Sequence, residues 1–328
     1  MKRIAFILNP ISGTRKKQVI IDYINKILGF HPECESSFYR TKCVGDACVA
    51  ARDFASKGYD VVVAIGGDGT VNEVAEGLIN TSSKLAIIPI GSGNGLARHL
   101  NIPLNFHRAV DTIFNGTHQF IDAGMINGKV FFCTAGVGFD AVVGDSFNKS
   151  GSRGLITYME YCAKEYVKYR PEYYEIILDG RKLKKKAFLI TFANSAQWGN
   201  NVFIAPDANI SDGMMDVVVW KATPKVTMPI LTAELFLKTI KYSEYVEIYR
   251  CKELTIKREK DALVQFDGES VMMGSELAMS VVNKAVEVIV PHGWRPVPQI
   301  KDLLPNAWRD LLPQQLMDII PKLKDIVK

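Results

Sequence analysis

Hydrophobic positions in the first 125 residues follow two alternating periods. Short runs of consecutive apolar residues predict buried strands, and apolar residues spaced three and four apart predict helices. The expected strands are 2–8, 35–41, 60–65 and 85–90, and the expected helices are 17–28, 44–57, 71–79 and one that starts within 94–100. Buried strands that alternate with helices favour an α/β domain with a doubly wound, mostly parallel sheet.

The pattern changes after about residue 125, where short strand-like runs separated by turn residues dominate. These runs are 129–134, 174–178, 187–193, 215–220, 245–249, 253–257, 263–266 and 285–290. Helical spacing occurs only near 155–169 and 229–241. We therefore expect a second domain, over residues 125–291, that forms an antiparallel β-sandwich.

Composition sets the class of protein. The 328 residues suffice for two domains, and 48% hydrophobic with 23% charged residues is ordinary for a soluble protein. The six cysteines form no C-x-x-C pair and have no histidine cluster beside them, which favours a reducing, cytoplasmic location. The apolar run Ile4–Leu8 is too short for a signal peptide, and no run has the length of a membrane span. The net charge of +5 permits an anionic partner without requiring one.

Three glycine-rich loops follow expected strands. They are Asn9–Gly13 (NPISG), Gly66–Thr70 (GGDGT) and Gly91–Gly95 (GSGNG), and each precedes an expected helix. Amides in such turns and at helix N-termini bind anions. Because the carboxyl ends of parallel strands meet at one edge of a sheet, the three loops together predict a phosphate-binding cleft.

The acidic residue within the second loop narrows the chemistry. Neither the P-loop template nor the dinucleotide template is present in the chain. Asp68 could help to hold Mg²⁺ beside phosphates, or it could orient an acceptor hydroxyl and take its proton. Both roles indicate phosphoryl transfer, whereas the alternative is that Asp68-Gly69 only forms a turn.

These loops resemble the nucleotide-binding signature of the diacylglycerol kinase catalytic-domain family, which includes bacterial lipid kinases and sphingosine kinases. The resemblance continues along most of the chain, from about residue 3 to 290. The later matching segments are Asp122-x-Gly124, GVGFDA (136–141), YRP (169–171), IAPDANISDGMMDV (204–217) and FDGE (266–269). GGDGT alone is shared with NAD kinases and phosphofructokinases, so the later segments make the lipid-kinase branch the specific match.

The resemblance implies a set of site residues. An ATP site would be lined by Asn9, Pro10, Ser12, Gly13, Thr41, Gly66, Gly67, Asp68, Gly69, Thr70, Asn72, Glu73, Gly91, Ser92, Gly93 and Asn94.

The resemblance also implies a Mg²⁺ site at Asp212, completed by main-chain carbonyls near Asn209 and Met214. Glu269 would be the proton acceptor, with Asp267 beside it. Asp68 would lie by the terminal phosphate, as a metal or water ligand or as the base itself, so the identity of the base stays open. Asp140 would lie near the acceptor head group.

Each of these residues has a structural alternative. Segments 211–213 and 267–268 would serve equally as hairpin turns, and Glu269 could be a surface residue. Asp140 could pair locally. His99 and His118 are interpreted as packing or surface residues, because the mechanism needs no histidine.

Two further segments carry hypotheses about surfaces. Five cations within 181–186 predict either a solvated hairpin tip or a contact with anionic lipid head groups. After Pro291 we expect the chain, over 292–328, to return to the first domain (1–124), as in the family. Prolines at 305, 313 and 321 suggest short helices in that tail, which would pack on the body or contact a membrane or a second subunit.

The predicted function is an ATP- and Mg²⁺-dependent lipid kinase, peripheral to the membrane, that converts diacylglycerol to phosphatidic acid. A sphingoid base or ceramide is the alternative acceptor, because Gly95 stands where many diacylglycerol kinases of the family carry an acid. A soluble-substrate kinase similar to NAD kinase and a non-catalytic nucleotide or lipid sensor are the other classes. The expected partner is a lipid at a membrane surface, with a homodimer as a further option; no nucleic acid partner is expected.

Overall fold

The computed structural model describes residues 2–13, 17–150 and 155–296. Its first domain is built on four parallel strands in the order β2-β1-β3-β4. Their bounds are β1 (Lys2–Leu8), β2 (Cys34–Arg40), β3 (Val61–Gly66) and β4 (Lys84–Pro89). The helices are α1 (Lys17–Leu28), α2 (Asp46–Ser56), α3 (Asp68–Gly77), α4 (Gly95–His99) and α5 (Phe106–Asn115).

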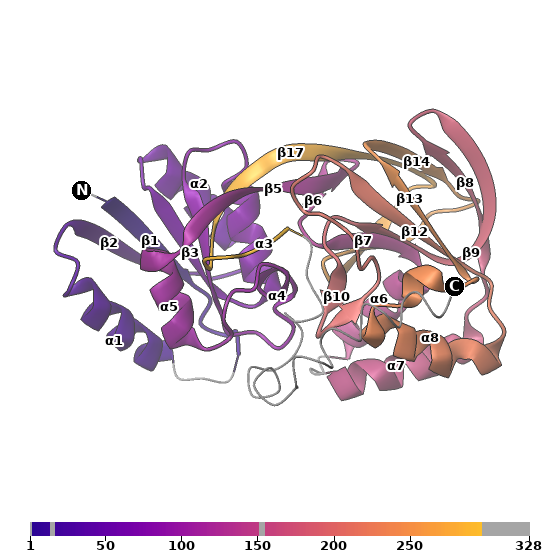
Figure 1. Cartoon of the computed structure of the whole chain (residues 1–328), viewed down its shortest axis with the longest axis horizontal. Coiled ribbons are helices and arrows are strands. Elements are labelled where there is room, and N and C mark those ends of the chain that lie inside the picture. Colours follow the sequence, from indigo (N-terminus) through magenta and orange to yellow (C-terminus); the bar gives the residue numbers. More distant parts are fainter. Residues whose placement is uncertain (1, 14–16, 151–154, 297–328) are drawn as a thin grey trace, which may run out of the picture.

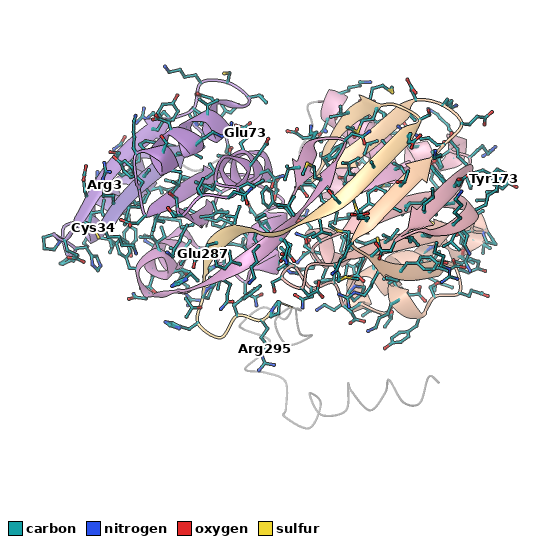
Figure 2. The ribbon with its side chains drawn as sticks, turned by 90° about the horizontal axis from the view of Figure 1, so that it is seen from above. Arg3, Cys34, Glu73, Tyr173, Glu287 and Arg295 are labelled. Carbon is teal, nitrogen blue, oxygen red and sulfur yellow. The ribbon has the colours of Figure 1, made fainter. Side chains whose placement is uncertain are left out.

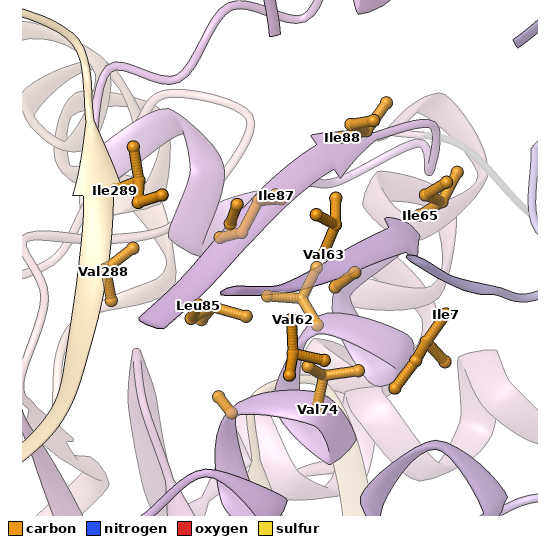
Figure 3. Close-up of a cluster of buried hydrophobic side chains, with 14 of the residues drawn as sticks. Ile7, Val62, Val63, Ile65, Val74, Leu85, Ile87, Ile88, Val288 and Ile289 are labelled. Carbon is orange, nitrogen blue, oxygen red and sulfur yellow. The ribbon is translucent and has the colours of Figure 1, made fainter. Parts of the chain in front are cut away.

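The core of this domain explains its continuous apolar strands. Every residue of β3 is buried, and so are the last five residues of β1 and of β4. Figure 3 shows Val63, Ile65 and Ile87 among the packed side chains of this sheet, with Val74 of α3 beneath it. Strands covered on both faces have no polar face, which is why these strands are continuous apolar runs, as the sequence predicted.

The second domain is antiparallel. Its strands are β6 (Lys129–Phe131), β7 (Thr134–Gly138), β8 (Glu172–Leu178), β9 (Arg181–Ala193), β10 (Gln197–Gly199), β11 (Val202–Phe203), β12 (Met215–Lys221), β13 (Val246–Cys251), β14 (Glu253–Lys257), β15 (Ala262–Phe266) and β16 (Glu269–Met273). Its helices are α6 (Phe139–Lys149), α7 (Leu155–Lys168) and α8 (Met228–Leu237), with short 3-10 turns at Lys225–Thr227 and Ile240–Tyr242. The three helices lie together along the lower edge of this domain in Figure 1.

Two long strands connect the domains. β5 (Thr117–Ile126) and β17 (Glu276–Val290) pair with each other, and β17 also pairs with β14 of the second domain and, at Val288, with β4 of the first. Figure 2 shows β17 crossing without a break from one domain to the other. Within the described residues the strands of both domains therefore belong to one fifteen-stranded sheet, except β10 and β11, which pair only with each other.

A bulge lies where β17 crosses. The pairing register shifts between Val282 and Val286, and Lys284 has a left-handed φ of 51°. The fully buried Asp122 of β5 accepts hydrogen bonds from the Lys284 amide (2.7 Å) and the Gly213 amide (2.7 Å). Asp122 thus fixes both the bulge and the loop before β12.

The predicted fold class is confirmed, with an α/β domain followed by an antiparallel sandwich. None of the described helices is long and apolar enough to cross a membrane. The prediction missed α5, β5, β7, α6, β10, β11 and β16, and it placed only the end of β17. It also treated the cations of 181–186 as a hairpin tip, whereas they form the start of β9 and the tip is Asp179-Gly180, with left-handed φ values of 44° and 87°. Leu183 is the one apolar residue among 181–186, so the two-residue period of a strand is not visible in this part of β9. Segment 297–328, on which the tail hypotheses rest, lies outside the described residues.

Candidate functional site

The three glycine-rich loops converge at the carboxyl ends of β1, β3 and β4. Gly13 has a left-handed φ of 64°, and a Cβ at this position would lie only 2.0 Å from the carbonyl oxygen of Ile90. A Cβ on Gly91 would lie 2.6 Å from the Cα of Gly67. Backbones this close exclude any side chain, so glycine at these positions is a requirement of the loop packing.

Asp68 joins two of these loops. It is the first residue of α3, and its Oδ2 and Oδ1 atoms accept hydrogen bonds from the amides of Asn94 (2.7 Å) and Gly95 (2.6 Å). Burial raises the pKa of Asp68, and the two amides oppose that rise. The carboxylate therefore holds the third loop in place while lying at the start of α3, where the first-turn amides have no partner within the helix.

Arg98, which the sequence analysis did not include, lies beside the third loop. Its Nε atom donates to the carbonyl oxygen of Gly93 (2.8 Å), so its guanidinium lies against the third loop. Burial lowers the pKa of Arg98, and the charge of Asp68 opposes this. The only available signal was its place in GSGNGLAR, one turn after the loop. A partly buried cation beside a phosphate loop is suited to neutralising phosphate charge.

Other residues assigned to the ATP site have structural partners. The side-chain amide of Asn9 donates to the Thr70 hydroxyl (3.0 Å), which links the first and second loops. The carboxylate of Glu73 accepts from the amides of Gly45 (2.9 Å) and Ala47 (3.1 Å). Glu73 therefore stabilises the start of α2. Ser92 is exposed at the tip of the third loop.

Asp267 lies in the turn between β15 and β16 and fastens the second domain to the first. Its two oxygens accept from the amides of Phe132 (2.7 Å), Cys133 (2.8 Å) and Thr134 (2.8 Å) and from the side chain of Asn72 on α3 (2.9 Å). Burial raises its pKa to about 6, against the effect of these amides. Four donors fill the acceptor positions of a carboxylate. This geometry favours a positioning role for Asp267 over the catalytic role expected from the sequence.

Glu269 reaches from the second domain toward the start of α3. It is the first residue of β16 and is exposed. Its Oε1 atom lies 3.8 Å from the position that a Cβ on Gly69 would take. The structure thus brings together Glu269, the second loop and Asp68, with the carboxylate of Glu269 accessible to solvent.

Asp140 lies in the first turn of α6, the helix that follows β7. Its Oδ1 accepts from the Ala141 amide (2.8 Å), while its buried Oδ2 has no hydrogen-bond partner among the described residues. Burial raises the pKa of Asp140 to about 7. The Ser270 hydroxyl donates to the Ala141 carbonyl (2.9 Å), so α6 is tied to the strand that begins with Glu269. No contact joins Asp140 to the glycine-rich loops.

The ion pairs and hydrogen bonds around Asp212 bear on whether a Mg²⁺ ion could bind there. Asp212 forms an ion pair with Arg250, which also lies 3.6 Å from the buried Asp216. The side-chain oxygen of Asn209 accepts from Ser211 (3.0 Å from its amide), and the Met214 amide donates to Asp212 (3.0 Å). Among the described residues no group of three or more His, Cys, Asp or Glu side chains could hold a metal ion. The one carboxylate of the expected set is paired with Arg250, so a metal ion at Asp212 would have to share or displace that cationic partner.

Comparison with known proteins decides the family. A family model described as the diacylglycerol kinase catalytic domain matches residues 3–126, and one described as the YegS C-terminal NAD kinase beta sandwich-like domain matches 133–290. The diacylglycerol kinase of Bacillus subtilis (strain 168) is 34% identical over 230 residues, which are 67% of this chain and 74% of that protein. The chain belongs to the diacylglycerol kinase catalytic-domain family. The resemblance inferred from its motifs is confirmed.

Other relatives extend the match over more of the chain. The diacylglycerol kinase of Staphylococcus saprophyticus is 29% identical over 307 residues, which are 89% of this chain and 96% of that protein. A crystal structure of a diacylglycerol kinase from Bacillus anthracis superposes with a TM-score of 0.73 at 22% identity, over 90% of this chain and 98% of that one. At that identity the structural likeness supports the fold alone. As a member of the diacylglycerol kinase family, the protein is a kinase that uses ATP.

The histidines of this kinase lie outside the carboxylate cluster. His99 is fully buried, accepts from the Ala196 amide (3.3 Å), and has its pKa lowered to about 4 by burial. His118 pairs with Glu287 (2.5 Å) near the other end of the sheet. Neither His99 nor His118 is bonded to Asp68 or Glu269, so neither is placed to transfer a proton there.

Proposed function

We propose that this kinase transfers the γ-phosphoryl group of MgATP to a hydroxyl of a membrane lipid, and that the acceptor is diacylglycerol. The observation that carries the proposal is the position of Glu269, an exposed carboxylate from the second domain that faces the first turn of α3. The names of the relatives, which are diacylglycerol kinases, support the choice of acceptor.

The proposed mechanism divides the work between the two domains. The amides of the glycine-rich loops and Arg98 bind the phosphates, since phosphoryl transfer depends mainly on positioning and on charge neutralisation. Each oxygen of Asp68 accepts one amide and retains an acceptor position, so Asp68 can hold the Mg²⁺ of the substrate or its water. Glu269 then accepts the proton from the attacking hydroxyl.

Asp267 and Asn72 keep the two walls of this site at a fixed separation. Their hydrogen bond joins α3 to the turn that precedes Glu269. An in-line transfer needs the acceptor and the phosphate to be held by such opposed walls. Asp140 lies on α6 beside the same strand, and it would contact the acceptor head group only if its buried, unpartnered oxygen became accessible.

A sphingoid base or ceramide is the second candidate acceptor, and Gly95 is the observation that favours it. The Gly95 amide donates to Asp68, and a Cβ there would lie 3.6 Å from the Asp68 Oδ1 atom and 3.8 Å from the Cys133 sulfur. The third loop therefore contributes no carboxylate at a position where many diacylglycerol kinases of the family carry one.

The test is phosphate transfer from labelled MgATP into mixed micelles of diacylglycerol, a sphingoid base, ceramide or phosphatidylglycerol. We expect labelled phosphatidic acid, and loss of at least about a hundredfold in kcat for Glu269→Gln. Glu253→Gln, an exposed glutamate of β14, is the matched control and should be unchanged. Labelling of a lipid other than diacylglycerol would contradict the proposed acceptor. Retention of activity in Glu269→Gln would contradict the assignment of Glu269 as the base. Binding of ATP without labelling of any lipid would favour a soluble acceptor or a sensor.

A further inference from the structure

The carboxylates around the start of α3 give the candidate site a negative charge. Asp68 begins this helix, Glu269 faces its first turn, and Asp267 accepts a hydrogen bond from its Asn72 side chain. Burial raises the pKa of Asp267, and the charge of Asp68 adds to that rise, so these two groups lie close together. The phosphates of ATP bring further negative charge, which Mg²⁺ only partly offsets. Cations from the protein are therefore needed beside the phosphates.

Two basic side chains are bonded to the glycine-rich loops. Arg98 donates to the carbonyl oxygen of Gly93 in the third loop. Lys17, the first residue of α1, donates from its Nζ atom to the carbonyl oxygen of Gly13 (3.0 Å), the last residue of the first loop. The mechanism proposed above uses Arg98 and leaves Lys17 without a role.

The partner of Lys17 lies where the three loops meet. The backbone of Gly13 packs so closely on Ile90 that a Cβ on Gly13 would lie 2.0 Å from the Ile90 carbonyl oxygen. Ile90 comes directly before the third loop, and its amide donates to the carbonyl oxygen of Gly66 (2.9 Å), the first residue of the second loop. The ammonium of Lys17 is therefore bonded to the first loop at the point where this loop contacts the other two.

The charge of Lys17 is not neutralised by the part of the chain that the structure describes. Lys57 and Lys149, at the ends of α2 and α6, each pair with an aspartate four residues earlier, whereas no described carboxylate forms an ion pair with Lys17. An ammonium has three donors, and the bond to Gly13 uses one of them.

The stability of α1 does not explain a lysine at this position. The first turn of a helix favours acidic side chains, because the positive end of the helix dipole lies there. The first turn of α1 holds no acidic residue and begins with Lys17. A cation that is unfavourable for its own helix, and that lies on a phosphate-binding loop, is suited to an anionic ligand.

We propose that Lys17 is a phosphate-binding residue, so that the phosphates of ATP are held between Lys17 at the first loop and Arg98 at the third. The inference rests on the proposed function only in placing the phosphates at these loops, and it requires no lipid. A lysine acts as a point charge on a flexible stem, whereas an arginine presents a planar fork. Lys17 can therefore adjust to phosphates whose position Arg98 and the loop amides define.

The experiment is calorimetric titration of the full chain, without lipid, with MgATP, MgADP and adenosine. The test variant is Lys17→Met, and the matched control is Lys26→Met, an exposed lysine in the last turn of the same helix. We expect Lys17→Met to weaken the binding of ATP about tenfold or more, since it removes a charged hydrogen-bond donor. The binding of ADP should weaken as well, and that of adenosine should be unchanged. Lys17→Arg, which keeps the charge, should restore most of the affinity.

Three outcomes would overturn the inference. The first is an affinity for ATP that is equal in the parent and in Lys17→Met. The second is an equal loss of affinity in Lys17→Met and Lys26→Met, which would indicate a general effect of charge. The third is an equal loss for ATP and adenosine in Lys17→Met, which would mean that Lys17 only shapes the first loop.

A measurement on the parent chain tests the same inference without a variant. Lysine side chains are acetylated with acetic anhydride in the presence and absence of MgATP, and the modified residues are quantified by mass spectrometry. We expect MgATP to slow the acetylation of Lys17 and to leave that of Lys26 unchanged. Equal rates for Lys17 with and without MgATP would contradict the contact.

These measurements separate the role of Lys17 from the proposed function. Weaker binding of ATP by Lys17→Met, in a parent chain that labels no lipid, would support the phosphate contact and contradict the lipid acceptor. Labelling of diacylglycerol by a parent chain whose Lys17→Met variant binds ATP normally would do the reverse.

Discussion

The carboxylate of Asp68 is held by the loop that it helps to shape. Two amides of the third loop converge on it, and the charge of Arg98 lies nearby. Asp267 is held in a similar way by three amides and Asn72. Both aspartates therefore stabilise the structure through their charge. Glu269 of β16 is the carboxylate that faces the start of α3 and stays accessible to solvent.

The double role of Asp68 leads to a prediction about its amide variant. Asp68→Asn would turn an N–H group toward one of the two donor amides. We expect the free energy of unfolding to fall by about 1–3 kcal/mol, together with loss of phosphoryl transfer. Urea unfolding and the transfer assay measure the two effects. Asp261→Asn, at an exposed position, is the control; an Asp68→Asn variant as stable as the parent would contradict the loop-bonding role.

Asp140 should make stability depend on pH. Its folded-state pKa of about 7 lies above the usual value for an aspartate, so the folded chain binds the proton more tightly than the unfolded chain does. The free energy of unfolding should therefore fall as the pH rises from 5 to 8, with this group contributing about 2 kcal/mol. Urea unfolding at both pH values should show a smaller fall for Asp140→Asn than for the parent. An equal fall in both proteins would mean that Asp140 is already charged in the folded chain at pH 5.

At the scale of elements, the site is an arrangement of turns that only glycine permits. The second and third loops pass so closely that Gly67 and Gly91 leave no room for a methyl group between them. The helices α3 and α4 begin within these loops, at Asp68 and Gly95, so loop packing also sets where the helices start. A change in loop spacing would therefore move the amides that face the nucleotide.

Gly91→Ala tests that arrangement. The added Cβ would meet backbone atoms at 2.6 Å, and the loops would have to separate. We expect KM for ATP to rise on the order of tenfold and the free energy of unfolding to fall by about 1–3 kcal/mol. Gly274→Ala is the control, because its nearest neighbour would lie at 4.0 Å. Equal kinetics for the two variants would show that the close approach is unimportant for nucleotide binding.

At the scale of the whole molecule, β5 and β17 carry the relation between the domains. Asp122 is buried where these strands cross, and it accepts from the amides of Gly213 and Lys284. The loop and the bulge that it fixes lie between the nucleotide domain and the sandwich. Replacing Asp122 should therefore lower the stability of the whole fold more than it changes phosphoryl transfer at the site.

Asp122→Asn would leave one of these buried amides without an acceptor. We expect a fall of about 2–3 kcal/mol in the free energy of unfolding, with Asp261→Asn again unchanged. Chemical unfolding followed by tryptophan fluorescence measures this. A fall below about 0.5 kcal/mol, the usual range for surface substitutions, would contradict the assignment of Asp122 as the residue that fixes the crossing.

How far the sequence predicts this molecule depends on the range of the interactions. The strands of the first domain and the three glycine-rich loops follow from local patterns, and the structure agrees with them closely. Helix α5 could also have been predicted from the sequence, because Asn105 caps its first turn, but the prediction did not include it. The donors to Asp267 are more than 130 residues distant in sequence from it, and the pairing of Arg250 with Asp212 spans 38 residues. No local pattern contains such partners, so the division of roles among the carboxylates emerged only from the folded chain.

The shared strands also limit how this protein can be divided. The family models end their segments at residue 126 and resume at 133, as if two modules could be separated. A fragment ending at 126 would keep β5 but lose its long pairing with β17, and β4 would lose its outer neighbour. Unpaired, apolar strand edges invite aggregation. The two regions can be told apart in sequence, yet they share β5 and β17, so we expect a truncation or fusion of this protein to need β17 along with whatever is kept of the first half.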